Sequence, residues 1–215
     1  MESRRVCYHR CVPDLNGPEA GACAFCNRDA TRETLLYEGR DFYVIADHAP
    51  IAEAHLLLIP REHFPHLAAL PERFHREYES LKAQLGEFIL SNYGSLTYWE
   101  NGVFGQSVPH AHLHAISVTF DPQVYVGNGV GFSGIAGLQE CHASADGSPY
   151  FVIEQEGRAH YLPPDLDLYL SIVRFARNSR PINWRFDREE RRLRGRTMVE
   201  ALMQRWRSQM DGRLD

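Results

Sequence analysis

The feature that most constrains the fold is a run of alternating histidines, His110-Ala111-His112-Leu113-His114-Ala115-Ile116. Alternate side chains of a β-strand point to the same face, so a strand here would carry all three imidazoles on one surface. The alanine and leucine residues between the histidines would then face the core. The run therefore predicts a strand of a sheet with three imidazoles on one face.

Two kinds of chemistry would use such a face. Neutral imidazole is the commonest metal ligand among side chains, so the three rings could share a metal ion. Alternatively, one imidazole could be a nucleophile that its neighbours position and that forms a covalent intermediate. A half-exposed strand without chemistry is the remaining interpretation. The turn-like run at residues 105–109 argues against it, because that run brings amide and hydroxyl groups to the start of the strand.

Composition and charge narrow the class of protein. A chain of 215 residues with 44% hydrophobic residues fits one domain, or one domain with a sizeable extension. The net charge of -5 gives no general attraction to nucleic acid or to an anionic membrane. No apolar run approaches the roughly 20 residues of a membrane span, and the N-terminus lacks an apolar signal segment. Five cysteines is an odd count, unlike a secreted disulfide framework, so we expect a cytoplasmic protein.

The pattern of hydrophobic residues predicts an α+β fold. Short runs rich in aromatic and branched residues predict strands at 35–37, 42–46, 55–60 and 95–100, ahead of the histidine strand. Hydrophobic residues recur at three- and four-residue steps between residues 70 and 89, which predicts a packing helix over 71–92. Residues 1–22 lack periodicity and are expected to form an irregular arm.

A second motif near the start of the chain is Cys23-Ala24-Phe25-Cys26. A Cys-x-x-Cys pair is a common half of a tetrahedral zinc site, although redox use and simple burial are alternatives. Cys7 and Cys11 lie in the N-terminal arm and could complete a site of four cysteines.

Taken together, these motifs resemble the histidine triad superfamily. Residues 110–116 match its His-φ-His-φ-His-φ-φ pattern, in which φ is apolar, and Gly-Gln-Ser-Val precedes the triad as is typical of it. The resemblance continues upstream through Asp47 and the segment from His55 to His63, and covers about residues 23–118. It implies an α+β domain at 23–119, with an antiparallel sheet and a packing helix, that forms a homodimer.

The resemblance implies a nucleotide hydrolase that forms a nucleotidyl-histidine intermediate at the α-phosphate. His112 would be the nucleophile, His114 and Gln106 would donate hydrogen bonds to phosphate oxygens, and Ser107 would assist the leaving group. Transferase members of the superfamily carry glutamine in place of the last histidine, so His114 favours hydrolysis over nucleotidyl transfer. The product would be a nucleoside monophosphate, released from a dinucleotide, a phosphoramidate or another nucleotide conjugate.

The resemblance also implies binding residues. Asp47 would bind the ribose, and Asn101 would lie near the phosphate, although the loop after Asn101 is shorter than in much of the family. His55 would support the triad from a neighbouring strand or simply satisfy another polar group. A structural zinc ion, with no organic cofactor, would be held by Cys23, Cys26, His63 and His110.

The remaining residues, 120–215, are expected to be a C-terminal extension. Its glycine-rich stretch at 120–148 predicts loops that could form a lid, followed by strands at 149–154 and 159–162. Helices are expected from residue 163 to Pro181 and over 185–210, and Arg158, His160, Arg174 and Arg185 are candidate anion contacts. Two rival functions stay open: a metal-dependent hydrolase that uses the triad as ligands, and a nucleotide-binding protein without turnover.

Overall fold

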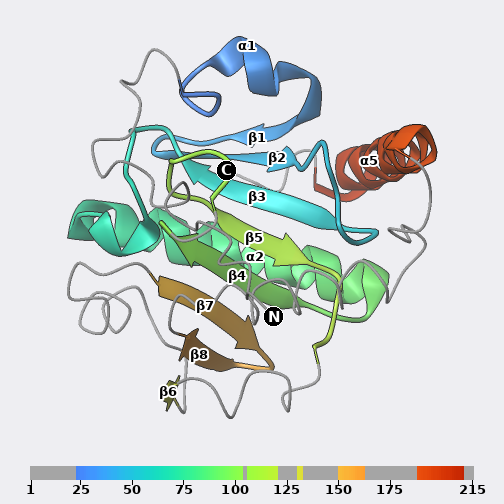
Figure 1. Cartoon of the computed structure of the whole chain (residues 1–215). Coiled ribbons are helices and arrows are strands. Elements are labelled where there is room, and N and C mark those ends of the chain that lie inside the picture. The colour runs from blue at the N-terminus through green and yellow to red at the C-terminus, as the bar shows by residue number, and fades with distance from the viewer. Residues whose placement is uncertain (1–22, 104–105, 121–129, 133–149, 163–187, 211–215) are drawn as a thin grey trace, which may run out of the picture.

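An antiparallel sheet of eight strands organises the computed structural model, which describes residues 23–103, 106–120, 130–132, 150–162 and 188–210 (Figure 1). The strand order is β1-β2-β3-β5-β4-β7-β8-β6. The long helix α2 (His75–Tyr93) crosses one face of the sheet. This architecture confirms the predicted α+β fold with an antiparallel sheet and a packing helix.

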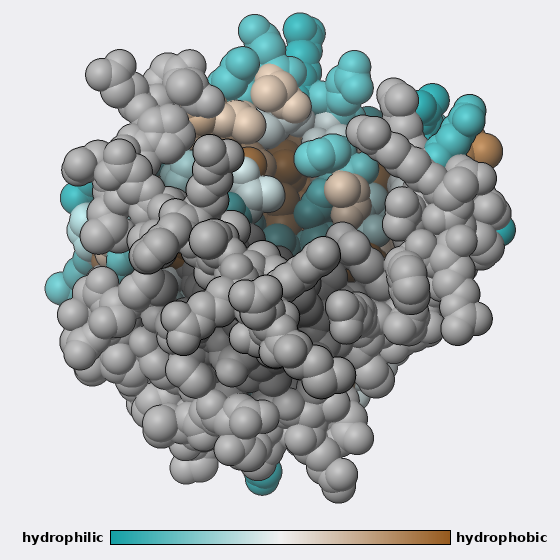
Figure 2. All heavy atoms as spheres, in the orientation of Figure 1, coloured by the Kyte–Doolittle hydropathy of each residue, from teal (hydrophilic) through white to brown (hydrophobic). Residues whose placement is uncertain are grey.

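The N-terminal part of the sheet consists of β1 (Leu35–Glu38), β2 (Phe42–Ala46) and β3 (His55–Pro60), after α1 (Arg28–Thr31) and the short helix η2 (Arg32–Thr34). β2 and β3 are buried along their whole length, as a run of apolar residues predicts for strands covered on both faces. On the face away from α2, side chains of β2 and β3 form a hydrophobic cluster of Tyr43, Ile45, Leu57 and Ile59. Figure 2 shows hydrophobic residues in a hollow bordered by hydrophilic ones over this part of the sheet.

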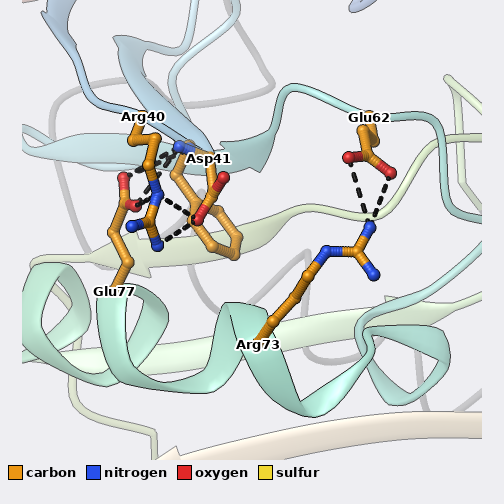
Figure 3. A network of polar contacts seen from close by, with 6 residues as sticks. Arg40, Asp41, Glu62, Arg73 and Glu77 are labelled. Carbon is orange, nitrogen blue, oxygen red and sulfur yellow. Dashed lines mark hydrogen bonds and ion pairs between the residues drawn. The ribbon is translucent and has the colours of Figure 1, made fainter.

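Helix α2 packs its apolar side on the other face of the sheet. The short helices η3 (Leu67–Ala69) and η4 (Glu72–Phe74) precede it, and Gly94 ends it at φ 75°, a left-handed conformation that glycine adopts without strain. Glu77 of α2 accepts hydrogen bonds from the backbone N–H groups of Asp41 and Phe42 (Figure 3). These bonds fasten the β1–β2 turn to the helix.

The strand that carries the triad is shorter than the sequence predicts. β5 (Leu113–Ile116) pairs with β3 and with β4 (Thr97–Gly102), so only His114 of the three triad histidines lies in a strand. The N–H of His110 instead donates to Val108 O at 2.8 Å, and the N–H of Ala111 donates to Phe64 O at 2.6 Å. This bend replaces regular ladder pairing, and Pro109 has no N–H with which to extend the ladder.

The described strands of the C-terminal extension continue the same sheet. β7 (Tyr150–Gln155) pairs with β4, β8 (Arg158–Leu162) pairs with β7, and β6 (Val130–Phe132) pairs with β8. The two strands predicted at 149–154 and 159–162 are confirmed to within one or two residues. The short strand β6 lies where only loops were predicted, because its glycine-rich sequence conceals a strand that is held by pairing with β8.

Helix α5 (Arg188–Met210) completes the core and confirms the helix predicted near the end of the chain. Its Val199, Leu202, Met203 and Trp206 are buried in the cluster formed by α2 and the sheet, and the Trp206 ring lies 5.0 Å from that of Phe88. The N-terminal arm, with Cys7 and Cys11, and the helix predicted from residue 163 to Pro181 lie outside the described residues. The division of the chain at residues 22 and 119 therefore stays a prediction. Among the described helices, none combines the length and the apolar character that a membrane span requires.

Candidate active site

The four predicted zinc ligands converge at one end of the sheet. Cys23 and Cys26 lie in the turn before α1, His63 follows β3, and His110 precedes β5. One ligand atom from each of these residues lies within 4.8 Å of the others. His110 is fully buried and Cys23 is 2% exposed, whereas Cys26 and His63 are half-buried, so the group lies at the edge of the core.

The distances within this group match the edges of a tetrahedron around zinc. His110 Nδ1 lies 3.4 Å from Cys23 Sγ and 3.5 Å from Cys26 Sγ, and His63 Nδ1 lies 3.3 Å from Cys26 Sγ. Zinc–sulfur bonds of about 2.3 Å and zinc–nitrogen bonds of about 2.0 Å at tetrahedral angles give a sulfur–nitrogen separation of about 3.5 Å. The arrangement is therefore compatible with zinc.

The tautomer of His110 also suits a metal ligand. His110 Nε2 lies 2.9 Å from Pro60 O, and because a carbonyl oxygen only accepts, Nε2 carries the proton. The lone pair of Nδ1 then points at the two thiols. Such a hydrogen bond from the outer nitrogen to a carbonyl commonly fixes metal-ligating histidines. Burial and the neighbouring Cys23 thiol raise the pKa of Cys26 to about 11, which a bound cation would oppose.

A hydrogen bond to a carbonyl oxygen also fixes the tautomer of His112, the second triad histidine. His112 Nδ1 lies 2.6 Å from the carbonyl oxygen of His110, so Nδ1 carries the proton and donates it to that oxygen. In the neutral ring Nε2 then holds an available lone pair. The ring is 4% exposed, with Phe25 at 5.2 Å and His114 at 4.7 Å between centroids. Burial lowers the pKa of His112 and so keeps the ring neutral at pH 7.

A chain of three polar groups supports His114. His55 Nε2 lies 2.8 Å from His114 Nδ1, and His55 Nδ1 accepts a hydrogen bond from the N–H of Ile51 at 3.4 Å. If Nδ1 of His55 accepts, its Nε2 carries the proton and donates to His114, whose own proton then resides on Nε2. Asp47 Oδ2 lies 3.4 Å from His55 Nδ1, the ring nitrogen that faces away from His114.

The outer nitrogen of His114 is therefore a donor for which the described part of the chain offers no acceptor. His114 Nε2 is buried and forms no hydrogen bond within the described residues. Burial lowers the pKa of His114 well below its ordinary value, and the rings of His112 and His55 add to this effect. Burial likewise lowers the pKa of His55, against the influence of the Asp47 carboxylate. The site thus presents one ring with a lone pair and one with an N–H, both neutral.

The other predicted site residues differ in their burial and in the hydrogen bonds that they form. Asp47 Oδ1 accepts from Ala49 N at 2.8 Å, and its side chain is 14% exposed. Asn101 lies within β4, just beyond the strand predicted at 95–100, and its buried Oδ1 has no hydrogen-bond partner in the described residues. Gln106 donates from Nε2 to Pro65 O at 3.2 Å, and Ser107 is exposed. Of these residues, Asp47 is the one that contacts the His55–His114 pair, through His55.

Two buried residues of β4 are missed by the sequence prediction, one on each face of the sheet. The Trp99 ring of β4 lies 5.1 Å from the His114 ring, on the same face of the sheet. Glu100 is 3% exposed and accepts from Leu67 N at 2.7 Å and from the Tyr150 hydroxyl at 2.8 Å, which ties β4 to the first residue of β7. A glutamate in a strand gives no sequence signal of burial, because its partners are 33 and 50 residues away in the chain.

Comparison with known proteins gives a consistent result. Residues 22–126 match the family model described as the C-terminal binding region of the scavenger mRNA decapping enzyme. The chain is 31% identical over 110 residues to the bifunctional adenosine 5'-phosphosulfate phosphorylase/adenylylsulfatase HINT4 of Arabidopsis thaliana, which covers 47% of this chain and 74% of that protein.

Solved structures that are named as histidine triad (HIT) proteins are also similar to part of this chain. A HIT family hydrolase from Clostridium thermocellum is 25% identical, with 46% of this chain and 91% of that chain covered and a TM-score of 0.38. A hypothetical histidine triad nucleotide-binding protein from Sulfolobus tokodaii is 20% identical, with 73% of this chain and 91% of that chain covered and a TM-score of 0.40.

Proposed function

Because the chain belongs to the histidine triad superfamily, we propose that it hydrolyses a nucleotide conjugate at the α-phosphate through a nucleotidyl-histidine intermediate. The observation that carries the proposal is the pair of opposed tautomers on neighbouring rings. His112 presents a lone pair at Nε2, and His114 presents an N–H at Nε2. A nucleophile beside a donor is what displacement at phosphorus requires.

In the first step, His112 Nε2 attacks the α-phosphorus and the bond to the leaving group breaks. The leaving group departs with the electron pair and takes up a proton. The positive charge that develops on His112 is relieved by its Nδ1–H, which donates to the carbonyl oxygen of His110 at 2.6 Å. In the second step, water attacks phosphorus and the N–P bond breaks, with its electron pair returning to His112 Nε2. The proton that water loses replaces the one that Ser107 gave to the leaving group, and a nucleoside monophosphate and free His112 result.

His114 stabilises the charge on the non-bridging phosphate oxygens by donating from Nε2. Its proton resides there because His55 occupies Nδ1 at 2.8 Å. In a buried site such a preorganised donor is worth more than in water, because it need not reorganise during the reaction. His55 is thus a positioning residue, and the N–H of Ile51, which donates to His55 Nδ1, orients it in turn.

The remaining predicted residues complete the proposed site. Asp47 would bind the ribose hydroxyls with its carboxylate, and Asn101, with its unpaired buried Oδ1, would lie beside the phosphate. Gln106 would donate to a phosphate oxygen, and Ser107 would supply the proton of the leaving group. Both would need to turn toward the triad from their present positions, since Gln106 now donates to Pro65 O.

Cys23, Cys26, His63 and His110 would hold a structural zinc ion, which would brace the segment from which His112 projects. When bound, zinc would supply only crosslinking of the chain here, because four protein ligands complete its tetrahedron. No organic cofactor enters the proposal. A homodimer and a cytoplasmic location stay predictions from the sequence.

The rival in which all three triad histidines bind one metal ion requires them to converge. His110 Nδ1 faces the two thiols, whereas His114 Nδ1 faces His55, so the two rings are committed to different groups. A metal at Asp47, His55 and His114, whose ligand atoms also lie within 4.8 Å, would displace the hydrogen bond between the two histidines. Hydrolysis that survives a chelator strong enough to remove weakly held metal would exclude both metal mechanisms.

The experiment that tests the proposed function is a substrate panel assayed for monophosphate release, with His112→Ala as the decisive variant. The panel contains adenosine and guanosine dinucleotides, phosphoramidates and nucleotide sugars. We expect turnover of at least one conjugate and its loss in His112→Ala, with circular dichroism unchanged. His48→Ala is the matched control, because that ring is 88% exposed beside Asp47. Full activity of His112→Ala would contradict the mechanism, and no turnover by any chain would favour the nucleotide-binding rival.

A further inference from the structure

A cavity on the α2 side of the sheet has a chemical character that the proposed function does not use. His114 pairs with Leu57, which belongs to the hydrophobic cluster on the face away from α2, so His114 lies on that other face. The cavity has a volume of about 440 Å³ and lies between α2 and the β1–β2 turn. Pockets for small molecules occupy about 300–1,000 Å³, so the cavity is large enough for a ligand the size of a nucleotide.

Arginine dominates the charge of this cavity. Arg73 of η4 and Arg76 of α2 line one wall, and Arg40 of the β1–β2 turn lines the other. The lining also includes the carboxylate of Glu77, but that group accepts hydrogen bonds from two backbone N–H groups of the turn, and its side chain is only 18% exposed. In a chain with a net charge of -5, this local excess of positive charge predicts an anionic ligand.

The three arginines keep N–H groups available for such a ligand. Arg40 bonds one oxygen of Asp41 through Nε and Nη2, and Arg73 reaches Glu62 through Nη2 alone, at 3.2 and 3.3 Å (Figure 3). Charge-assisted N–H···O bonds are normally about 2.7–2.9 Å long, so the Arg73–Glu62 pair is loose. Exposed pairs of this kind contribute little to stability, so an anion can compete for the arginine. Arg76 is exposed and has no polar partner within the described part of the chain.

The cavity also offers apolar surface beside the arginines. Leu81 is 4% exposed and belongs to the main core. Tyr37 packs against the same core but is only half-buried, and it lines the cavity. Ser80 and Gln84, whose side chains bond each other at 3.2 Å, add a hydroxyl and an amide to the wall. An aromatic ring beside guanidinium groups suits a ligand that combines a planar ring with a phosphate.

We propose that this cavity is a binding site for an aromatic phosphate ester, the chemical class to which nucleotides belong, and that the site is separate from the triad. Arg76, together with the available N–H groups of Arg40 and Arg73, binds the phosphate, because a guanidinium matches two phosphate oxygens with parallel N–H groups. The planar ring packs on Tyr37 and Leu81. The inference does not depend on the proposed function.

Titration with adenosine monophosphate, followed at the arginine side chains, tests the site. NMR spectra of protein with nitrogen-labelled arginine report each Nε–H group, and single variants assign the signals. We expect saturable shifts of the signals of Arg40, Arg73 and Arg76, in wild type and in His112→Ala alike. Arg76→Ala should weaken the binding by about tenfold, as loss of a charge-assisted hydrogen bond implies, and Arg76→Glu should abolish it. Arg196→Ala is the matched control, because that arginine is exposed on α5, outside the cavity, and the affinity should not change.

Two further ligands show which parts of the ester are bound. Ribose phosphate lacks the planar ring and adenosine lacks the phosphate, so each should bind about tenfold more weakly than adenosine monophosphate. Equal affinities of ribose phosphate and adenosine monophosphate would overturn the aromatic class of ligand. No saturable shift at Arg76, or a shift of the same size at Arg196, would overturn the site itself. None of these measurements requires turnover, so the site can fail while the nucleotidyl-histidine mechanism stands, and Arg76→Glu should keep the turnover of wild type.

Discussion

Replacing Glu100 by glutamine should change how the stability of the protein depends on pH. Glu100 is 3% exposed, and its only described hydrogen-bond donors are Leu67 N and the Tyr150 hydroxyl. Burial raises the pKa of its carboxyl from 4.5 to about 7, and the two donors only partly oppose this. The folded protein therefore holds a proton that the unfolded chain releases at lower pH.

The direction and the size of the effect follow from this difference. Below pH 4.5 both states are protonated, so the acid form contributes its full stability. Between pH 4.5 and about 7 the unfolded chain is ionised while the folded protein is not, so the free energy of unfolding falls as pH rises. At about 1.36 kcal/mol per pH unit over that interval, the loss is about 3 kcal/mol. Above pH 7 the folded carboxyl ionises too, and the loss stops.

Urea denaturation of wild type and Glu100→Gln between pH 5 and 8 measures the effect. The amide keeps an acceptor for Leu67 N but cannot ionise, so the variant should gain about 3 kcal/mol on wild type as pH rises across the interval. The histidines, including His66 whose ring lies 5.6 Å from that of Tyr150, are common to both chains, so the difference isolates Glu100. Glu62→Gln is the control, because its side chain is 60% exposed. Parallel curves for wild type and Glu100→Gln would refute the reasoning.

Three further predictions concern the site. Cys23→Ser should reduce bound zinc to well below one ion per chain and lower the melting temperature, as metal analysis and calorimetry would show; a full complement of zinc in this variant would contradict the proposed ligands. His55→Leu should lower kcat by about tenfold to a hundredfold with little change in KM, and His55→Gln should retain more activity because its amide can still donate to His114; equal losses in the two variants would argue against positioning. Burial lowers the pKa values of His55, His112 and His114, so their contribution to stability is present above pH 6.5 and is lost as pH falls; a Glu100→Gln variant whose stability is unchanged between pH 7 and pH 5 would contradict this.

The periodicity of hydrophobic residues predicts those helices and strands that depend on local sequence alone. Alternation of apolar residues locates β2 and β3, and the three- and four-residue repeat locates α2. The pairing of Cys23 and Cys26 with His63 and His110 was available only through resemblance to a family. No spacing rule connects a thiol pair with imidazoles 37 and 84 residues away.

Other features depend on tertiary contacts and could not be predicted. The alternation of the triad predicts one strand, yet His110 and His112 lie in a bend, since Ala111 pairs with Phe64 rather than with a neighbour in the ladder. The tautomers of the rings follow from carbonyls and N–H groups that only the folded chain brings together. The pairing of β7 with β4, which extends the sheet toward Arg158, likewise has no signature in either strand.

The central claim is that His112 becomes covalently bonded to phosphorus, and rapid quenching of the enzyme with labelled nucleotide conjugate tests it most directly. Peptide mapping of the quenched protein should locate one acid-labile nucleotidyl group on His112, formed before the monophosphate is released. Turnover without labelled protein, or a label on any residue other than His112, would contradict the account.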